Sequence, residues 1–197
     1  MAPLSVAVVV SGRGSNLRAI HEQAAGLGYR VSGVVSNNPA AAAVAYARAA
    51  SLPVTVVDHR LFADRASFDE ALAAALAEFR PEIIALAGFL RVLGPAFVRR
   101  HAGRLINIHP SLLPAFPGLN THRRALAAGV REHGATVHFV TEALDGGPII
   151  AQARLAVQDG EDAATLAGRV LALEHTLYPA VLERFARDTI PLPAQTP

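Results

Sequence analysis

Residues 6–16 read VAVVVSGRGSN, and this stretch decides the fold class. The run Val6–Val10 is apolar at every position, as in a strand that helices cover on both faces. Glycines at positions 12 and 14 then predict a tight turn into a helix. A buried strand, a glycine-rich turn and a helix form the opening unit of a parallel α/β sheet.

The same alternation of short β-branched runs and alanine-rich stretches continues along the chain. It predicts an α/β protein with a single doubly wound, mostly parallel sheet of the Rossmann type, which binds ligands at the carboxyl ends of its strands. The expected strands are Val6–Val10, Val31–Ser36, Val54–Val57, Ile83–Ala87, Leu105–His109, Thr136–Val140 and Ile149–Val157, and the expected helices are Leu17–Ala25, Ala41–Ala50, Phe68–Phe79, Pro95–His101, Arg123–Ala128 and Ala163–Phe185. Asp162 is the expected N-cap of the last helix.

The composition indicates one folded domain. The chain has 197 residues, of which 52% are hydrophobic, and one core can serve such a length. The absence of cysteine excludes disulfides, thiol nucleophiles and Cys-ligated zinc. The histidines lack the spacing of a zinc-binding helix, so we expect no metal. We therefore expect a single domain over residues 1–197.

Charge and hydropathy favour a protein that acts on small molecules. The 18 basic residues are all arginine, and the net charge of +2 is small for a protein that binds nucleic acid. No stretch approaches the ~18 apolar residues of a membrane span. The N-terminal apolar run is too short for a signal peptide. We expect a cytoplasmic monomer or homodimer that binds neither nucleic acid nor membrane.

The turn Ser11–Asn16 has the features of an anion site. Its glycines let the backbone approach a ligand, and free amides at the start of a helix favour negative charge. The dinucleotide fingerprint is not met, because Leu17 stands where a third glycine belongs, and a Walker loop requires a lysine that the chain lacks. Two interpretations stay open, a site for a single phosphate or a tight turn capped by Ser15 or Asn16.

A second polar pattern lies in the expected strand Leu105–His109. Asn107 and His109 face the same way, because positions i and i+2 of a strand share a face. A histidine can transfer a proton near neutral pH, and an asparagine amide can stabilise an oxyanion. Asp145, in an Asp-Gly-Gly-Pro loop, could orient the imidazole. The pattern favours acyl transfer without a protein nucleophile. The alternatives without a catalytic role are hydrogen bonds of Asn107 and His109 within the core and an ordinary turn at Asp145.

Four stretches together resemble the glycinamide ribonucleotide formyltransferases, the folate-dependent enzymes of purine synthesis. They are SGRGSNL (11–17), LAGFLRVLGPAFV (86–98), GRLINIHPSLLPAFPGLNTHRRAL (103–126) and HGATVHFVTEALDGGPII (133–150). The INIHPSLLP segment is shared with other formyl-folate enzymes, and the SGxGSN loop narrows the resemblance to the glycinamide ribonucleotide formyltransferases. It implies a formyltransferase-like fold and transfer of the formyl group of 10-formyltetrahydrofolate, the co-substrate, to the amine of glycinamide ribonucleotide.

The resemblance also implies a role for each matching residue. Asn107, His109 and Asp145 would be catalytic, and Gly14, Ser15 and Asn16 would hold the substrate phosphate. Glu174 would contact the ribonucleotide, although the residues alone favour a solvated charge beside the stripe Leu166/Val170/Leu173/Leu177. The residues expected to bind folate are Arg65, Leu90, Arg91, Val92, Leu93, Asn107, Thr141, Glu142, Ala143, Leu144 and Asp145. Residues 1–105 would then form a nucleotide-binding half and residues 106–190 a folate-binding and catalytic half.

Three other functions use a similar scaffold. In 10-formyltetrahydrofolate hydrolases water replaces the amine, and an extra N-terminal domain is present that we do not expect here, because the first strand begins near residue 5. Methionyl-tRNA formyltransferases add a tRNA-binding domain, and the net charge of +2 here is small for binding tRNA. A non-catalytic folate-binding protein would not need the Asn107, His109 and Asp145 group. Arg13 stands at a variable position, where it either adds a phosphate contact or faces solvent.

Overall fold

The computed structural model describes residues 2–190, in which a seven-stranded sheet has the strand order β3-β2-β1-β4-β5-β6-β7. The strands are β1 (Leu4–Val10), β2 (Tyr29–Ser36), β3 (Val54–Val56), β4 (Ile83–Leu86), β5 (Leu105–His109), β6 (Glu132–Phe139) and β7 (Ile149–Ala156). The first five strands pair in parallel, and β6 and β7 extend the sheet as antiparallel neighbours. The predicted mostly parallel sheet is confirmed.

The helices are α1 (Ser15–Leu27), α2 (Ala42–Ala49), α3 (Arg65–Glu78), α4 (Pro95–Arg100), α5 (Thr121–Ala127) and α6 (Ala163–Ala186), with a short 3-10 helix, η1 (His59–Leu61), that the sequence did not predict. Predicted and observed ends differ most at β6, which begins at Glu132 because it pairs with β7 from there. The Asp162 cap is confirmed, since its carboxylate accepts a 2.7 Å hydrogen bond from the Thr165 amide.

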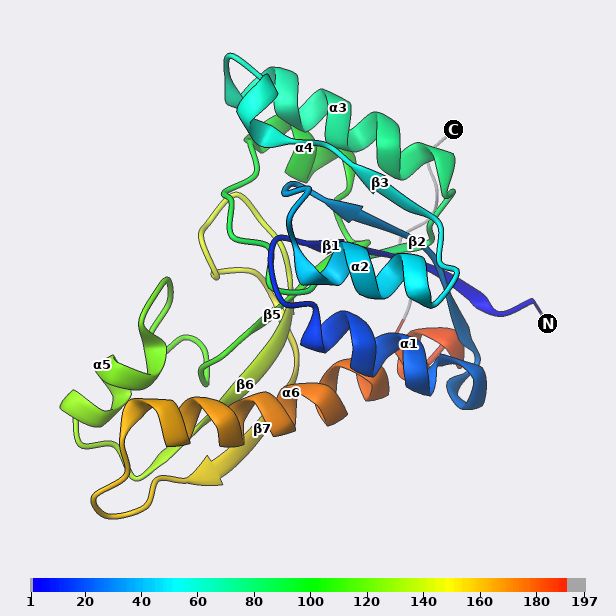
Figure 1. Ribbon diagram of the computed structural model, residues 1–197. Coiled ribbons are helices and arrows are strands. Elements are labelled where there is room, and N and C mark those ends of the chain that lie inside the picture. Colours follow the sequence, from blue (N-terminus) through cyan, green and yellow to red (C-terminus); the bar gives the residue numbers. More distant parts are fainter. Residues whose placement is uncertain (1, 191–197) are drawn as a thin grey trace.

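Both faces of the sheet are covered, which explains the uniformly apolar first strand. Val6, Val8 and Val10 pack in a core with α1, α2 and α6. Ala7 and Val9 face the opposite way, into a core with α3 and α4. Figure 1 shows α3 and α4 on one side of the sheet and α1 and α6 on the other. No helix among residues 2–190 is long and apolar enough to cross a membrane.

The order in which the chain adds strands to the sheet reverses between β1 and β4. Strands β2 and β3 lie on one side of β1, and β4 and β5 lie on the other. The loops that leave β1, β4 and β5 therefore open at the same carboxyl edge, which is where doubly wound sheets bind ligands. The amide of Ser11 donates to the Gly88 carbonyl at 3.2 Å and so ties the first two loops together.

Helix α6 is fixed to this part of the sheet by Tyr178 and to α1 by Gln23. The buried Tyr178 hydroxyl lies 3.0 Å from the Leu86 carbonyl and 3.2 Å from the Ile106 carbonyl, at β4 and β5. Pro179 has no amide hydrogen, which frees the carbonyl one turn earlier, at His175. The side-chain amide of Gln23 in α1 donates to that carbonyl at 3.0 Å. These contacts set the position of the helix that carries Glu174.

Candidate active site

The polar side chains of β5 meet polar side chains of β6 across the antiparallel pair. Asn107 lies directly opposite His138, and His109 lies opposite Thr136. Directly opposed residues of an antiparallel pair project from the same face, so these four side chains gather at one place. His138 was not predicted as a site residue, since the register between β5 and β6 is not visible in the sequence.

Both ring nitrogens of His109 face hydrogen-bond acceptors. Nε2 lies 3.0 Å from the carbonyl of Phe116, and Nδ1 lies 3.4 Å from Oδ2 of Asp145. The two side chains are 8% and 9% exposed, so water screens their attraction only weakly. A neutral imidazole has one N–H and could satisfy only one of these acceptors, whereas the imidazolium satisfies both. The geometry therefore places a hydrogen-bond acceptor at each ring nitrogen of His109.

The His138 ring orients Asn107. Burial lowers the pKa of His138, against the opposing hydrogen bond to Phe139 and the charge of Asp145. The neutral ring donates from Nδ1 to the Phe139 carbonyl at 2.9 Å. Nε2 is then an acceptor, and the amide nitrogen of Asn107 lies 3.3 Å from it. One N–H of Asn107 is held in this way, which leaves the second for a ligand.

The loop after β6 presents Asp145 through a constrained backbone. Asp145 has φ 50°, and its Oδ2 accepts a 2.8 Å hydrogen bond from the amide of Gly118. A Cβ at Gly147 would overlap the carbonyl of Phe139, so this position excludes any larger residue. Asp145 thus connects His109 to the loop that follows β5, and Gly147 allows the chain to turn back into β7.

A pocket of about 130 Å³ adjoins this cluster and receives residues from both halves of the chain. Many of its walls are residues predicted to bind folate. These are Arg91, Val92, Leu93, Asn107, Thr141, Glu142, Ala143, Leu144 and Asp145, and the structure adds Leu86, Phe89, Val98, His138 and Val140. The added residues are mostly apolar, and nothing in a single sequence separates them from core residues.

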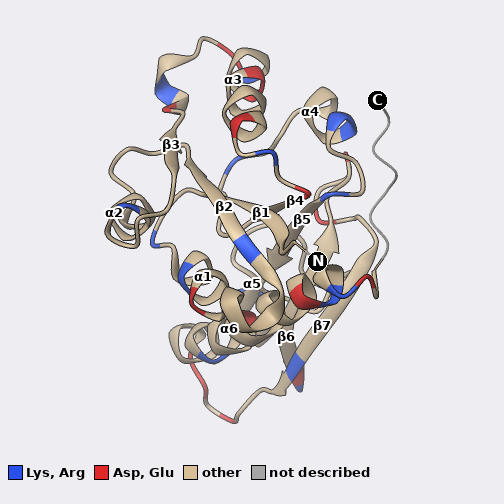
Figure 2. Cartoon of the chain, turned by 90° about the vertical axis from the view of Figure 1, so that its right-hand side faces the viewer, with Lys and Arg blue, Asp and Glu red and all other residues tan. Residues whose placement is uncertain are grey.

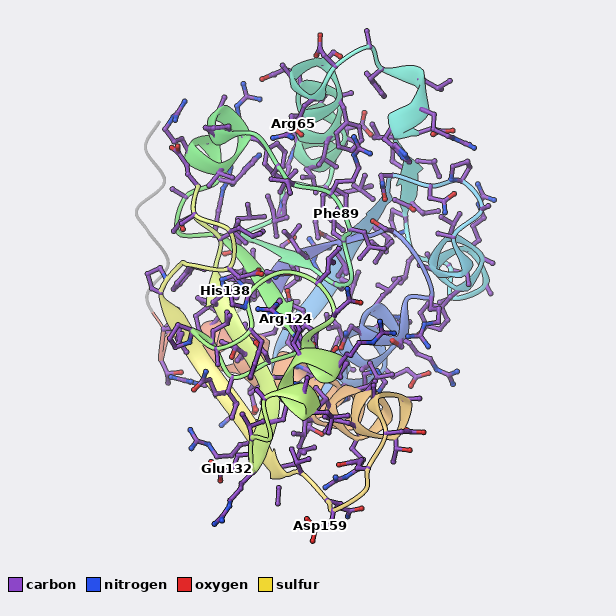
Figure 3. The ribbon with its side chains drawn as sticks, turned by 90° about the vertical axis from the view of Figure 1, so that its left-hand side faces the viewer. Arg65, Phe89, Arg124, Glu132, His138 and Asp159 are labelled. Carbon is purple, nitrogen blue, oxygen red and sulfur yellow. The ribbon has the colours of Figure 1, made fainter. Side chains whose placement is uncertain are left out.

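Arg65 and Leu90 do not line this pocket. Leu90 is 77% exposed. In Figure 3, Arg65 projects from α3 above Phe89, while His138 lies farther down on β6. Burial raises the pKa of Asp69, and the amide of Gly94 and the charges of Arg65 and Arg91 oppose that shift. Arg65 and Arg91 therefore share a neighbourhood, where their positive charges could meet an anionic end of a ligand.

The glycine-rich turn after β1 has the geometry of an anion site. Gly14 adopts φ 78°, and a Cβ there would lie 2.6 Å from that of Ala43. No side chain caps the start of α1, so the suggested cap by Ser15 or Asn16 is wrong. The side-chain amide of Asn16 (Nδ2) donates instead to Oε2 of Glu174 at 2.6 Å. The uncapped amides of the first turn stay available to a ligand.

Glu174 is buried, which corrects the expectation of a solvated charge from the residues alone. It lies in the buried stripe Leu166, Val170, Glu174 and Tyr178 of α6, four residues apart. Burial raises the pKa of Glu174, opposed by the Asn16 hydrogen bond and the charge of Arg13. Arg13 is exposed at the tip of the turn, close enough to act on Glu174. The uncapped turn and a buried carboxyl thus stand side by side.

Comparison with known proteins matches this arrangement to one family. The family model described as formyl transferase covers residues 4–182. The chain belongs to the formyl transferase family. A relative within the family is the phosphoribosylglycinamide formyltransferase of Escherichia coli (strain K12), 43% identical over 185 residues that cover 93% of this chain and 87% of that protein. The resemblance seen in the sequence is confirmed.

Solved structures of formyl transferases share the fold at similar length. The phosphoribosylglycinamide formyltransferase of Coxiella burnetii is 47% identical with a TM-score of 0.90, over 94% of this chain and 88% of that one. Glycinamide ribonucleotide transformylase 1 from Symbiobacterium toebii is 37% identical with a TM-score of 0.93, over 98% and 92%. Among residues 2–190, no three His, Asp or Glu side chains are grouped as metal ligands.

Proposed function

We propose that this formyl transferase moves the formyl group of 10-formyltetrahydrofolate to the amine of glycinamide ribonucleotide, a step of purine synthesis. The observation that carries the proposal is the placement of two unlike sites at one sheet edge. The uncapped turn at Gly14–Asn16 suits a phosphate. The pocket beside Asn107, His109 and Asp145 has largely apolar walls with a few polar groups, which suits a flat ring that makes hydrogen bonds at its edge.

Glycinamide ribonucleotide would bind across the first of these sites. Its phosphate would lie on the amides of Gly14, Ser15 and Asn16, and Glu174 would accept hydrogen bonds from the ribonucleotide. The Asn16–Glu174 hydrogen bond supports this arrangement, since it holds the carboxylate beside the turn. Arg13 would add a positive charge at the open side of the phosphate.

10-Formyltetrahydrofolate would bind in the second site. The backbone of residues 90–93 and 141–145 would contact the pterin ring, whose donors and acceptors lie in one plane. Arg65 and Arg91, which both act on Asp69, would meet the carboxylates at the far end of the molecule. The division into a nucleotide-binding half (residues 1–105) and a folate-binding and catalytic half (residues 106–190) remains part of the proposal.

The reaction would be direct transfer with no covalent enzyme intermediate. The neutral amine attacks the formyl carbon, and the carbonyl oxygen becomes an oxyanion. The free N–H of Asn107 and the protonated His109 would stabilise that charge as it develops. As the oxyanion collapses and the bond between the formyl carbon and the folate nitrogen breaks, His109 would give its proton to that departing nitrogen, while Asp145 holds the ring. The attacking nitrogen would lose a proton, which would return to His109 through Asp145 or a water and so restore the starting state. Holding both substrates together would supply much of the acceleration.

Absorbance tests the proposal directly. The purified protein is mixed with 10-formyltetrahydrofolate, and release of deformylated folate is followed with and without glycinamide ribonucleotide. We expect release only with the ribonucleotide, and a product heavier by one formyl group. The riboside that lacks the phosphate is the control and should be a poor substrate. Equal release without the ribonucleotide would indicate a hydrolase, and folate binding without release would indicate a binding protein.

Three expectations from the sequence stay predictions. They are the cytoplasmic location, the monomeric or homodimeric state, and the absence of nucleic-acid and membrane partners. Sedimentation at micromolar concentration would measure the oligomeric state, and electrophoretic mobility of RNA and DNA would test nucleic-acid binding.

A further inference from the structure

A larger cavity lies at the opposite edge of the sheet from the proposed active site. It has a volume of about 550 Å³ and lies between α3 and α4, with walls that include Glu70, Arg80, Arg100, His101 and Arg104. Pro81 lies two residues before β4 and Arg104 directly precedes β5, so this α3–α4 pocket opens at the amino ends of those strands. Its volume falls in the ~300–1,000 Å³ range of small-molecule sites.

The charges around the α3–α4 pocket do not balance. Glu70 and Arg100 form an ion pair at 3.0 Å. The guanidiniums of Arg80 and Arg104 have no carboxylate partner within residues 2–190. Figure 2 shows α3 and α4 on the same side of the sheet, with Asp and Glu red on α3 and Arg blue on α4. Two positive charges remain, which is the charge needed to balance a phosphate monoester at neutral pH, about −1.5 to −2.

His101 adds a hydrogen-bond donor without a partner. Burial, with the charges of Arg104 and Arg100, lowers the pKa of His101 to about 4, so the ring is neutral at neutral pH. Nη2 of Arg104 lies 3.2 Å from Nδ1 and can only donate to it. The ring proton is therefore on Nε2, which is buried and has no hydrogen-bond partner in the described residues. A buried donor without a partner is costly unless a ligand supplies an acceptor.

Arg80 occupies a backbone conformation that favours glycine. Its φ is 45°, just beyond the end of α3. Glycine is the usual residue at this position, because a Cβ in the left-handed region costs roughly 1–2 kcal/mol. Its guanidinium makes no hydrogen bond or ion pair within residues 2–190. Arg80 is therefore an unpaired cation at a strained backbone position.

The remaining walls are small and apolar. Ala73, Ala77, Leu76 and Ile84 line the cavity, and the last two are almost fully buried. Alanine side chains leave a flat surface against which a ring can pack, and guanidinium planes stack on rings while they bind phosphate. We propose that the α3–α4 pocket binds a nucleoside monophosphate, with the phosphate between Arg80 and Arg104 and the base against the alanines of α3.

Calorimetric titration of the full chain with AMP tests this site. We expect Arg80→Gly and Arg104→Ala each to weaken AMP binding by about tenfold or more, as loss of a charge-assisted hydrogen bond predicts. Arg80→Gly should also keep or raise the Tm, because glycine suits the backbone there. Arg48→Ala is the matched control, since it removes one exposed positive charge on α2 and should leave AMP binding unchanged.

Other ligands complete the test. Adenosine and inorganic phosphate should each bind more weakly than AMP. The proposal is overturned if AMP does not bind at millimolar concentration, or if adenosine or phosphate alone binds as tightly. It is also overturned if Arg80→Gly binds AMP like the wild type, because the ligand would then occupy the turn at Gly14–Asn16. Formyl transfer at saturating substrates should be the same in Arg80→Gly and the wild type, so this test and that of the proposed function fail independently.

Discussion

Asn16 donates a hydrogen bond of 2.6 Å to Glu174 across 158 residues of sequence, and both side chains are buried. The contact joins the turn after β1 to helix α6. It places a carboxyl group beside the proposed phosphate site. In the proposed complex the turn would bind the phosphate of the ribonucleotide, and Glu174 would accept hydrogen bonds from its hydroxyl or amine groups.

The variant Glu174→Gln tests this pair through pH. Burial raises the pKa of Glu174 above the ordinary value of 4.5. Such a carboxyl favours folding at low pH and loses that contribution as pH rises through its folded pKa. Compared with Glu174→Gln, the wild type should therefore be less stable at about pH 8 than at about pH 4. Each kcal/mol of lost stability lowers Tm by roughly 2–4 °C. Thermal melts at both pH values measure the difference, and a constant difference would contradict the account.

The same variant should bind glycinamide ribonucleotide less well. Glutamine keeps an acceptor for Asn16 but loses the charge, so KM for the ribonucleotide should rise about tenfold while KM for the folate stays unchanged. Steady-state kinetics with each substrate varied in turn separates the two constants. A rise in the folate KM alone would place Glu174 outside the ribonucleotide site.

His138 is predicted to act by positioning Asn107. His138→Phe keeps a ring but removes the acceptor that lies 3.3 Å from the Asn107 amide. We expect kcat to fall about tenfold, the effect of roughly 1.4 kcal/mol, with little change in either KM. His138→Gln retains an acceptor and should recover part of the loss. If Phe and Gln variants lose kcat equally, the hydrogen bond to Asn107 is not what matters.

Two glycine substitutions form a matched pair for the loop of Asp145. Gly147→Ala would place a Cβ against the Phe139 carbonyl. It should lower the free energy of unfolding by about 1–3 kcal/mol and also lower kcat, because Asp145 moves with the loop. Gly168→Ala, on the exposed side of α6, meets nothing within 4 Å and should raise stability by about 0.5–1 kcal/mol. Denaturant unfolding compares the two variants, and equal changes in their free energy of unfolding would contradict the overlap at Gly147.

The sequence predicted the sheet because its strands are short, apolar and separated by helices. It also predicted Asn107 and His109 as a pair, since the period of a strand places them on one face. It could not predict His138, whose place opposite Asn107 depends on the register of β5 and β6. Nor could it predict the burial of Glu174, because the buried stripe of α6 passes through that residue instead of Leu173. Registers and helix rotations arise from tertiary packing, which one sequence does not display.

The role of His109 is the central claim of the mechanism. Both of its ring nitrogens face acceptors, and in the proposed mechanism the ring would stabilise the oxyanion and donate a proton. The decisive measurement is single-turnover formyl transfer to glycinamide ribonucleotide by the wild type and His109→Ala, with thermal melts to confirm that the variant folds. We predict a rate lower by about 10²–10⁴-fold in a folded variant that still binds both substrates. A folded His109→Ala protein that transfers the formyl group at close to the wild-type rate would contradict the account.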